Sequence, residues 1–179
     1  MSWQLLLTYW RDKHSAGKPP ARADLDPLAE ITTLVPNLFL IDVIRDTFKM
    51  RLVGSEIMLR AGVDQTGMIM ESRTVEARGI EVWLGYLRRA VRDCTPILYG
   101  FAPGDHAAPP AIGIVVPLVN DGIVDMLLGG LFFDPAFASA EQPPLFSWEL
   151  TELAIPADLS EQPVPIRASA TKPDTSAPS

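Results

Sequence analysis

The sequence predicts an α+β domain, in which an antiparallel sheet of five strands carries helices on one face and follows an amphipathic N-terminal helix. Three observations lead to this fold class. Apolar runs are joined by very short links, which is typical of antiparallel hairpins. The clearest helical pattern, at residues 74–94, separates two such runs from three others, so helices and strands do not alternate as they do in parallel sheets. The N-terminal residues repeat apolar side chains with helical spacing. The expected strands are residues 37–44, 47–54, 96–102, 110–119 and 124–133.

The first helix is expected within residues 1–18. Its apolar face carries side chains at positions i, i+3, i+4, i+7 and i+11, which are Trp3, Leu6, Leu7, Trp10 and His14. Gly17 and the pair Pro19-Pro20 then end the helix.

Shorter elements follow it. Asp26 is the expected N-cap of a short helix, with Pro27 at the first helical position, and this helix ends before Pro36. Residues 55–62 form another short helix, which ends at a glycine. The last two strands are joined at residues 120–122 by Asn-Asp-Gly, a strong hairpin signal.

Both faces of the expected sheet are apolar. In residues 37–44 and 124–133 the side chains of both alternating faces are largely apolar, whereas a sheet with one wet face alternates apolar and polar residues. The inner helices would cover one face, and either the N-terminal helix or the sheet of a second subunit would cover the other. We therefore expect a homodimer that forms through the N-terminal helix and the outer sheet face. The expected dimer or partner residues are Trp3, Leu6, Leu7 and Trp10.

Composition changes along the chain of 179 residues. Residues 135–179 hold eight of the 17 prolines, whereas all twelve glycines lie at or before Gly130. Such a segment cannot bury enough apolar surface to offset its ordering entropy, although residues 145–156 have strand-like spacing that permits pairing with the sheet edge. The expected organisation is an N-terminal helix at 1–18, a compact domain at 19–134, a partly ordered appendage at 135–160 and a disordered tail at 161–179.

Charge and cysteine content exclude several classes of partner. The single cysteine cannot form an intrachain disulfide, and no apolar run approaches the roughly 20 residues that span a bilayer. The N-terminal residues lack the features of a secretory signal, so we expect a cytoplasmic protein with no membrane partner. A formal net charge of −7 argues against a nucleic-acid surface.

Several strings together resemble a known family. They cover nearly all of residues 8–133 and are TYWRDK (8–13), PPARADLDPLAEITTLVPNLFLIDV (19–43), KMRLVGSEI (49–57), DQTGM (64–68) and PLVNDGIVDMLLGGLFF (117–133). In this order the sequence resembles the short stand-alone PAS-like proteins of bacteria. The resemblance implies a five-stranded antiparallel sheet in PAS strand order beside a long central helix. It also implies a sensing or protein-interaction role rather than catalysis, and it transfers no catalytic residue. Residues 103–111 depart from the more polar hairpin turn that is usual in the family.

Single residues offer little chemistry. His14 continues the apolar face of the first helix, where packing is the simpler role, and His106 lies in a loop rich in Gly and Pro. Haem-binding PAS sensors typically take their ligand histidine from the long helix, which has none here. Cys94 lacks the sequence neighbours of a flavin-adduct cysteine and is expected to be buried and inert. No metal site is expected, and no cofactor is assigned.

The resemblance implies a ligand cavity between the inner sheet face and the long helix. Methionines, which adapt to irregular spaces, concentrate between residues 50 and 70. The candidate lining residues are Met50, Leu52, Met58, Met68, Met70, Trp83, Leu87, Ile114, Val116 and Phe132. The alternative is that these side chains simply fill the core.

The leading functional hypothesis is a single-domain PAS-type sensory or adaptor protein, and not an enzyme. It would bind a small apolar molecule, an unknown signalling protein, or both. The residues after 134 are too few and too rich in proline to form an effector domain, so output would pass through another protein or through a dimer rearrangement. Two alternatives remain open. One is a small α+β enzyme that uses Asp42 and Arg51 as a polar pair, and the other is a structural scaffold without a ligand.

Overall fold

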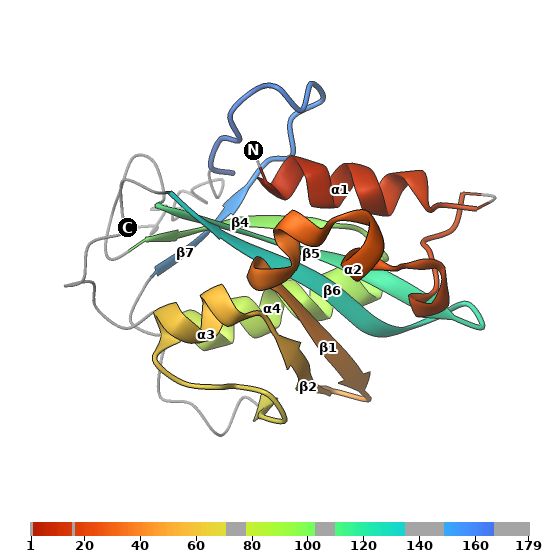
Figure 1. The fold of residues 1–179 in the computed structure, drawn as a ribbon, viewed down its shortest axis with the longest axis horizontal. Coiled ribbons are helices and arrows are strands. Elements are labelled where there is room, and N and C mark those ends of the chain that lie inside the picture. Colours follow the sequence, from red (N-terminus) through yellow and green to blue (C-terminus); the bar gives the residue numbers. More distant parts are fainter. Residues whose placement is uncertain (1, 16, 71–77, 103–109, 135–148, 167–179) are drawn as a thin grey trace, which may run out of the picture.

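The structure is a computed structural model of residues 1–179, and it describes residues 2–15, 17–70, 78–102, 110–134 and 149–166. Within these ranges one sheet has the strand order β3-β2-β1-β6-β5-β4-β7, with every neighbouring pair antiparallel (Figure 1). The strands are β1 (Leu38–Ile44), β2 (Thr47–Val53), β3 (Ile69–Met70), β4 (Ile97–Ala102), β5 (Ala111–Asn120), β6 (Ile123–Phe133) and β7 (Glu149–Leu153). The α-helices are α1 (Ser2–Asp12), α2 (Pro27–Glu30), α3 (Ser55–Ala61) and α4 (Arg78–Asp93), and the 3₁₀ helices are η1 (Arg22–Asp24) and η2 (Thr32–Asn37).

The five predicted strands are present as β1, β2, β4, β5 and β6, and they lie side by side in the sheet. The predicted number of strands is wrong, because the described part of the chain has seven. β3 is only two residues long and pairs with β2, so it is too short to produce a period of its own. β7 lies in the proline-rich C-terminal region and pairs with β4 through residues 149–153.

One face of the sheet packs against α3 and α4. We call the cluster on this face the inner core. Leu84, Leu87 and Ala90 project from α4 at helical spacing and have no exposed surface. They meet sheet residues such as Ile41 and Val115, which are also fully buried. The predicted helix at 74–94 corresponds to α4, and residues 74–77 lie outside the described residues.

The opposite face packs against α1 and the segment 22–37, forming a second cluster that we call the outer core. Leu25, Ile31 and Leu34 are buried there beside Leu98 and Ile114 of the sheet. Figure 1 shows α1 and α2 on the side of the sheet opposite α4. Helices therefore cover both faces, and α1 provides the second cover, which is one of the two alternatives expected from the sequence. The prediction that the remaining helices all lie on one face is wrong, because residues 22–37 pack on the same face as α1. Both strand faces are apolar, so alternation could not tell which face the short helices cover.

Two hydrogen bonds fix α1 and the following chain to strand β5. The indole Nε1 of Trp10 donates to the carbonyl oxygen of Pro117 at 2.7 Å, and the backbone N–H of Val119 donates to the carbonyl of Pro20 at 3.0 Å. β4 pairs with β5 only as far as Val115, so these two groups lie on a stretch of β5 that β4 leaves unpaired. Pro117 suits this position because it has no N–H to offer a neighbouring strand.

The four residues predicted to face a partner are buried within their own chain. Their exposed fractions are 1% for Trp3, 0% for Leu6 and Leu7, and 4% for Trp10. The structure therefore corrects their assignment as a dimer surface, because α1 already uses this face to cover its own sheet. Homodimerisation itself stays a prediction.

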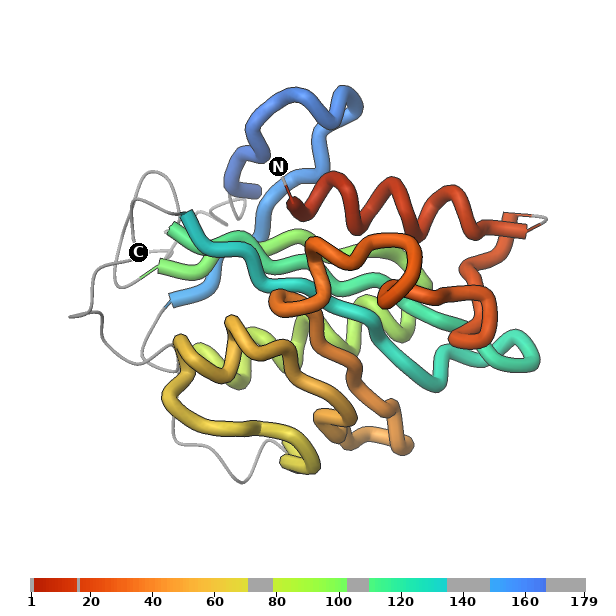
Figure 2. The backbone as a smooth tube through the Cα atoms, viewed as in Figure 1, coloured from red at the N-terminus to blue at the C-terminus, as the bar shows by residue number. Residues whose placement is uncertain are grey.

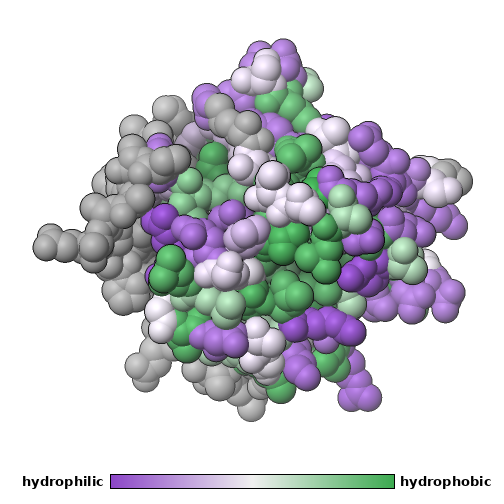
Figure 3. Space-filling model, in the orientation of Figure 1, coloured by the Kyte–Doolittle hydropathy of each residue, from purple (hydrophilic) through white to green (hydrophobic). Residues whose placement is uncertain are grey.

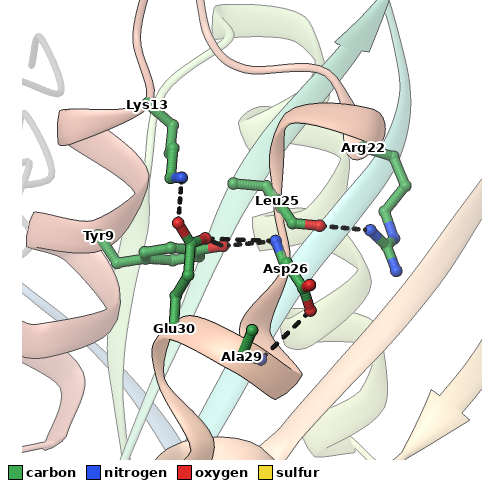
Figure 4. A network of polar contacts seen from close by, with 7 residues as sticks. All are labelled: Tyr9, Lys13, Arg22, Leu25, Asp26, Ala29 and Glu30. Atoms are coloured by element: carbon green, nitrogen blue, oxygen red, sulfur yellow. Dashed lines mark hydrogen bonds and ion pairs between the residues drawn. The ribbon is translucent and has the colours of Figure 1, made fainter.

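A polar network joins the end of α1 to α2 (Figure 4). The hydroxyl of Tyr9 donates to the Glu30 carboxylate at 2.7 Å and accepts from the backbone N–H of Asp26 at 2.8 Å, while Lys13 pairs with the other carboxylate oxygen of Glu30. Asp26 caps α2 as predicted, since its side chain accepts from the N–H of Ala29 at 3.2 Å. Burial and the bond to Glu30 raise the pKa of Tyr9, so its hydroxyl stays a donor.

The C-terminal segment returns to the domain after β7. Leu153 is 2% exposed, and Ile155 and Leu159 pack against the outer core. Figure 2 follows this segment toward the N-terminal end of α1. Residues 164–166 then run beside β7, with the N–H of Ile166 donating to the carbonyl of Glu152. Ordered structure thus continues to residue 166, past the predicted start of the tail at 161, and residues 167–179 lie outside the described residues.

The polar network predicts a pH-dependent contribution to stability. Hydrogen bonds from Lys13, then from Tyr9, hold the pKa of Glu30 below its ordinary value of 4.5. A carboxyl whose pKa is lower in the folded state stabilises the fold above its unfolded pKa, and this contribution is lost as pH falls through the folded pKa. In urea unfolding, the stability advantage of the wild type over Glu30→Gln should be constant above about pH 6 and shrink below about pH 4.5. Lys13→Met should reduce the pH-dependent part, and a constant advantage down to about pH 2 would contradict this assignment.

Candidate ligand pocket

A small cavity lies between the sheet and the helices α3 and α4. Its volume is about 80 Å³, and none of the described side chains that line it is charged. The lining is apolar except for the amide of Gln65 and the polar tips of Trp83 and Tyr99. The lining residues are Phe39, Met50, Ile57, Gln65, Met68, Met70, Gly79, Ile80, Trp83, Tyr99, Phe101, Leu131 and Leu150.

Two aromatic rings form the floor of the pocket by lying directly against glycines of the sheet. A Cβ atom placed on Gly113 would lie 2.2 Å from Cε2 of Tyr99, and one on Gly129 would lie 2.1 Å from Cζ of Phe39. Tyr99 and Gly113 face each other across the β4–β5 pair, as Phe39 and Gly129 do across the β1–β6 pair. Any larger residue at either glycine would displace a ring toward α4 and fill the cavity.

Trp83 of α4 closes the pocket over these rings. Its indole Nε1 donates to the hydroxyl oxygen of Tyr99 at 3.0 Å, and its ring meets Phe39 edge to face with centroids 5.9 Å apart. Tyr99 is 1% exposed, and this burial raises the pKa of its hydroxyl, which therefore stays protonated.

Met50, Met68 and Met70 supply the flexible part of the lining. Residues 67–70 run beside β2, since the N–H of Met50 donates to the carbonyl of Met68 and the N–H of Gly67 donates to the carbonyl of Met50. A turn positions this segment. The Asp64 carboxylate accepts from the N–H of Thr66 at 2.8 Å, a bond that lowers the pKa of Asp64, and Gly67 has a φ of +85°.

The pocket also receives Leu150 from β7, which an ion pair links to α4. Arg89 of α4 pairs with Glu152, and this hydrogen bond raises the pKa of Arg89. Both groups keep part of their surface exposed, so the pair serves mainly to orient the strand. The C-terminal region thus contributes to the pocket as well as to the sheet.

Four of the ten predicted lining residues do line the cavity, namely Met50, Met68, Met70 and Trp83. Met58 and Leu87 belong to the inner core without lining the pocket. The remaining four are misplaced, because they lie on the outer face of the sheet or pack in the outer core, and they are Leu52, Ile114, Val116 and Phe132.

A β-bulge explains the error at Leu52. Ile41 pairs with Met50 and Leu40 pairs with Leu52, so Arg51 is an extra residue in β2. The bulge turns Leu52 to the face opposite Met50, although strict alternation would place the two side chains together. In β5 and β6 the predicted residues were assigned to the wrong face of the sheet. Both faces of these strands are apolar, so the alternation of side chains cannot show which face is the inner one.

A second cavity, of about 110 Å³, lies on the outer face between the segment 22–35 and the sheet. Its walls are aliphatic apart from Arg22 and Phe39, and the guanidinium of Arg22 donates to the carbonyl of Leu25. Leu28 and Leu52 leave 72% and 49% of their surfaces exposed here. Figure 3 shows apolar residues gathered on this side of the molecule.

The other candidate groups do not form a cleft. Arg51 pairs with Asp42 at 3.1 Å, but 58% of its side chain is exposed. The ring of His14 packs against Trp10 with centroids 4.2 Å apart, as expected of a packing histidine, and Cys94 is a partly buried free thiol whose pKa is raised by burial. His106 lies outside the described residues.

The parts of the chain that the structure describes contain no cluster of three or more metal-ligating side chains. None of the helices in those parts is long and apolar enough to cross a membrane.

Comparison with known proteins identifies the family. The family model described as PAS domain matches residues 1–115. The chain belongs to the PAS domain family. This confirms the resemblance found in the sequence, and the matched region contains α1 as well as the helices and most of the strands that build the pocket. β6 and β7 lie outside it, although both contribute lining residues.

Two solved structures show a weak likeness to this PAS protein. The repressor BlcR of Agobacterium tumefaciens has 12% sequence identity and a TM-score of 0.33, with 82% of this chain and 66% of that chain covered. The IcIR transcriptional regulator from Alicyclobacillus acidocaldarius has 14% identity and a TM-score of 0.32, with 77% and 65% covered. The chain thus spans about two thirds of their length, and at these scores neither carries an argument about function. None of the curated proteins matches the chain.

The contact between ring and glycine predicts the stability of two alanine variants. Gly113→Ala should destabilise the protein by about 1–3 kcal/mol, because the new methyl group overlaps the Tyr99 ring. Gly85→Ala is the matched control, since nothing lies within 4 Å of its Cβ position on α4 and alanine favours helix by about 0.8–1.0 kcal/mol. Urea unfolding measures both changes, and equal stability of Gly113→Ala and Gly85→Ala would contradict the packing described.

Proposed function

We propose that this PAS domain is a sensory module, which takes a small apolar molecule into the pocket and signals its presence through contact with another protein. The observation that carries the proposal is the pocket itself, a cavity whose described lining is largely apolar and uncharged, with aromatic rings and three methionines. Family membership supports a sensory rather than a catalytic role. The free thiol of Cys94 suits a reducing compartment, so we place this role in the cytoplasm.

The size of the cavity limits the ligand. Pockets for drug-sized molecules hold about 300–1,000 Å³, whereas an apolar protein cavity of about 150 Å³ binds benzene. At about 80 Å³ this pocket suits a compact molecule with few non-hydrogen atoms. The methionines can adjust their rotamers to its shape, because their side chains are unbranched.

The pocket is also well placed to report its occupancy. Its lining comes from β1, β2, β4, β6, β7, α3, α4 and the segment 65–70, so an occupant touches both the sheet and the helices that cover it. A ligand that favours one arrangement of these elements shifts the population toward it, and a partner protein can read that shift.

Methionine-methyl NMR provides the test. Of the six methionines, Met50, Met68 and Met70 line the pocket, while Met126 packs in the outer core and serves as an internal reference. Native mass spectrometry should detect a small molecule retained by the purified protein. This molecule can be extracted from the purified protein with an organic solvent, which leaves the protein without its ligand. Adding the extract back to the ligand-free protein should shift the NMR signals of the three lining methionines and leave that of Met126 unchanged.

Two variants of α4 sharpen this test. Ile80→Trp should abolish the shifts, because Ile80 lines the cavity and the larger ring fills it. Val82→Trp should preserve them, since Val82 is 42% exposed and is not a lining residue. A purified protein that carries no molecule, and whose lining signals do not respond to a panel of small neutral compounds, would overturn the proposed function.

A further inference from the structure

The pocket contains a buried hydroxyl whose proton has no acceptor among the described residues. The oxygen of the Tyr99 hydroxyl accepts the hydrogen bond from Trp83, and no bond donated by this hydroxyl to a described residue is present. Tyr99 is 1% exposed, so water has little access to the proton. A buried donor without an acceptor costs about 1–3 kcal/mol, and it therefore needs a reason.

The described neighbours of this hydroxyl do not supply an acceptor for its proton. Tyr86, the nearest tyrosine ring, lies with its centroid 5.8 Å from that of Tyr99, and its oxygen bonds to the backbone of Glu152. Phe101 is a further aromatic neighbour, and its side chain has no oxygen. Gly113 gives the Tyr99 ring its position against the sheet, so the ring cannot approach the strand further to find a carbonyl.

We infer that the pocket selects a neutral, compact molecule with one hydrogen-bond acceptor, such as a carbonyl or ether oxygen, which takes the free proton of the Tyr99 hydroxyl. This inference rests on the proposed function and names the ligand class of the same site. The ligand needs an acceptor because the oxygen of the Tyr99 hydroxyl already accepts from Trp83, whereas its O–H can still donate a hydrogen bond. The remainder of the ligand is apolar, because the rest of the described lining, apart from the Gln65 amide and the indole N–H of Trp83, consists of aromatic rings, aliphatic side chains, a glycine and thioethers.

The ligand carries no charge. None of the described residues that line the cavity is charged, and an ion among these side chains would lose its hydration without gaining a partner. An anion would also gain only a single hydrogen bond from Tyr99, which is less than a buried charge requires. Burial keeps the pKa of Tyr99 above its ordinary value, so the hydroxyl remains a neutral donor throughout the physiological range.

Two isosteric probes separate the hydrogen bond from apolar packing. Cyclobutanone and methylenecyclobutane have the same ring and differ only in the acceptor oxygen. Dissociation constants for both come from the methyl shifts of Met50, Met68 and Met70. Tyr99→Phe should lower the affinity for cyclobutanone relative to methylenecyclobutane by about three- to tenfold, the usual value of one net hydrogen bond. Using the ratio of the two affinities removes the effect of any change in pocket volume.

Tyr86→Phe is the matched control, because it removes a neighbouring hydroxyl that does not line the cavity. This variant should leave the affinity ratio at its wild-type value. If both probes bind and Tyr99→Phe leaves the ratio unchanged, the ligand class is overturned while the pocket stands as a binding site. If neither probe shifts the three methionine signals of the wild type, the ligand class is overturned, and the proposed function fails as well if the purified protein also carries no molecule and the wider panel gives no shift.

A measurement on the wild-type protein covers the case in which Tyr99→Phe does not fold. The infrared carbonyl stretch of bound cyclobutanone should lie at lower frequency than in an apolar solvent, since a hydrogen bond weakens the carbonyl double bond. A stretch at the apolar-solvent frequency would overturn the inference.

Discussion

The fold depends on one constraint, which is that both faces of its antiparallel sheet are apolar and need a cover. Isolated, such a sheet would expose residues such as Ile114 and Leu127, which are fully buried in the structure. The inner face is covered by α3 and α4, and the outer face by α1 with the segment 22–37. Placing the second cover in the same chain explains why α1 has an aromatic, almost wholly buried face. It also explains the bond from Trp10 to Pro117, which satisfies a carbonyl on the stretch of β5 that β4 leaves unpaired.

The pocket follows from the way the inner face is packed. Glycines at 113 and 129 allow two rings to lie flat on the sheet, and the space between these rings and α4 becomes the cavity. The same arrangement buries the Tyr99 hydroxyl between a sheet and a helix, where Trp83 is the one described residue that donates to its oxygen. The packing that creates the cavity thus also places a buried hydrogen-bond donor in its wall, and this donor favours a ligand with an acceptor over a purely apolar molecule.

The sequence predicted the positions of helices and strands better than it predicted the face of the sheet on which each side chain lies. Each of the five long strands and α4 has a pattern several residues long, and Asp26 begins α2 with the expected cap. The assignment of side chains to a face failed where both faces of a strand are apolar, as in β5 and β6, and where Arg51 forms a bulge that local periodicity does not show.

Phe39 and Tyr99 were missed as pocket residues because their role depends on glycines distant in sequence. A signal did exist, since Gly113 and Gly129 interrupt strands that are otherwise rich in branched residues. Leu150 was missed because its strand follows a long proline-rich stretch and joins the sheet at the far edge.

Amide hydrogen exchange of α1 tests the central claim most directly, because the two possible covers of the outer face give opposite results. If α1 belongs to its own domain, the amides of its last two turns should exchange only with global opening, at the same free energy as those of β5, and their protection should not depend on protein concentration. Mass spectrometry after exchange at two well-separated concentrations resolves both segments. Much faster exchange in α1 than in β5, or protection of α1 that rises with concentration, would contradict the account and place the cover in a second subunit.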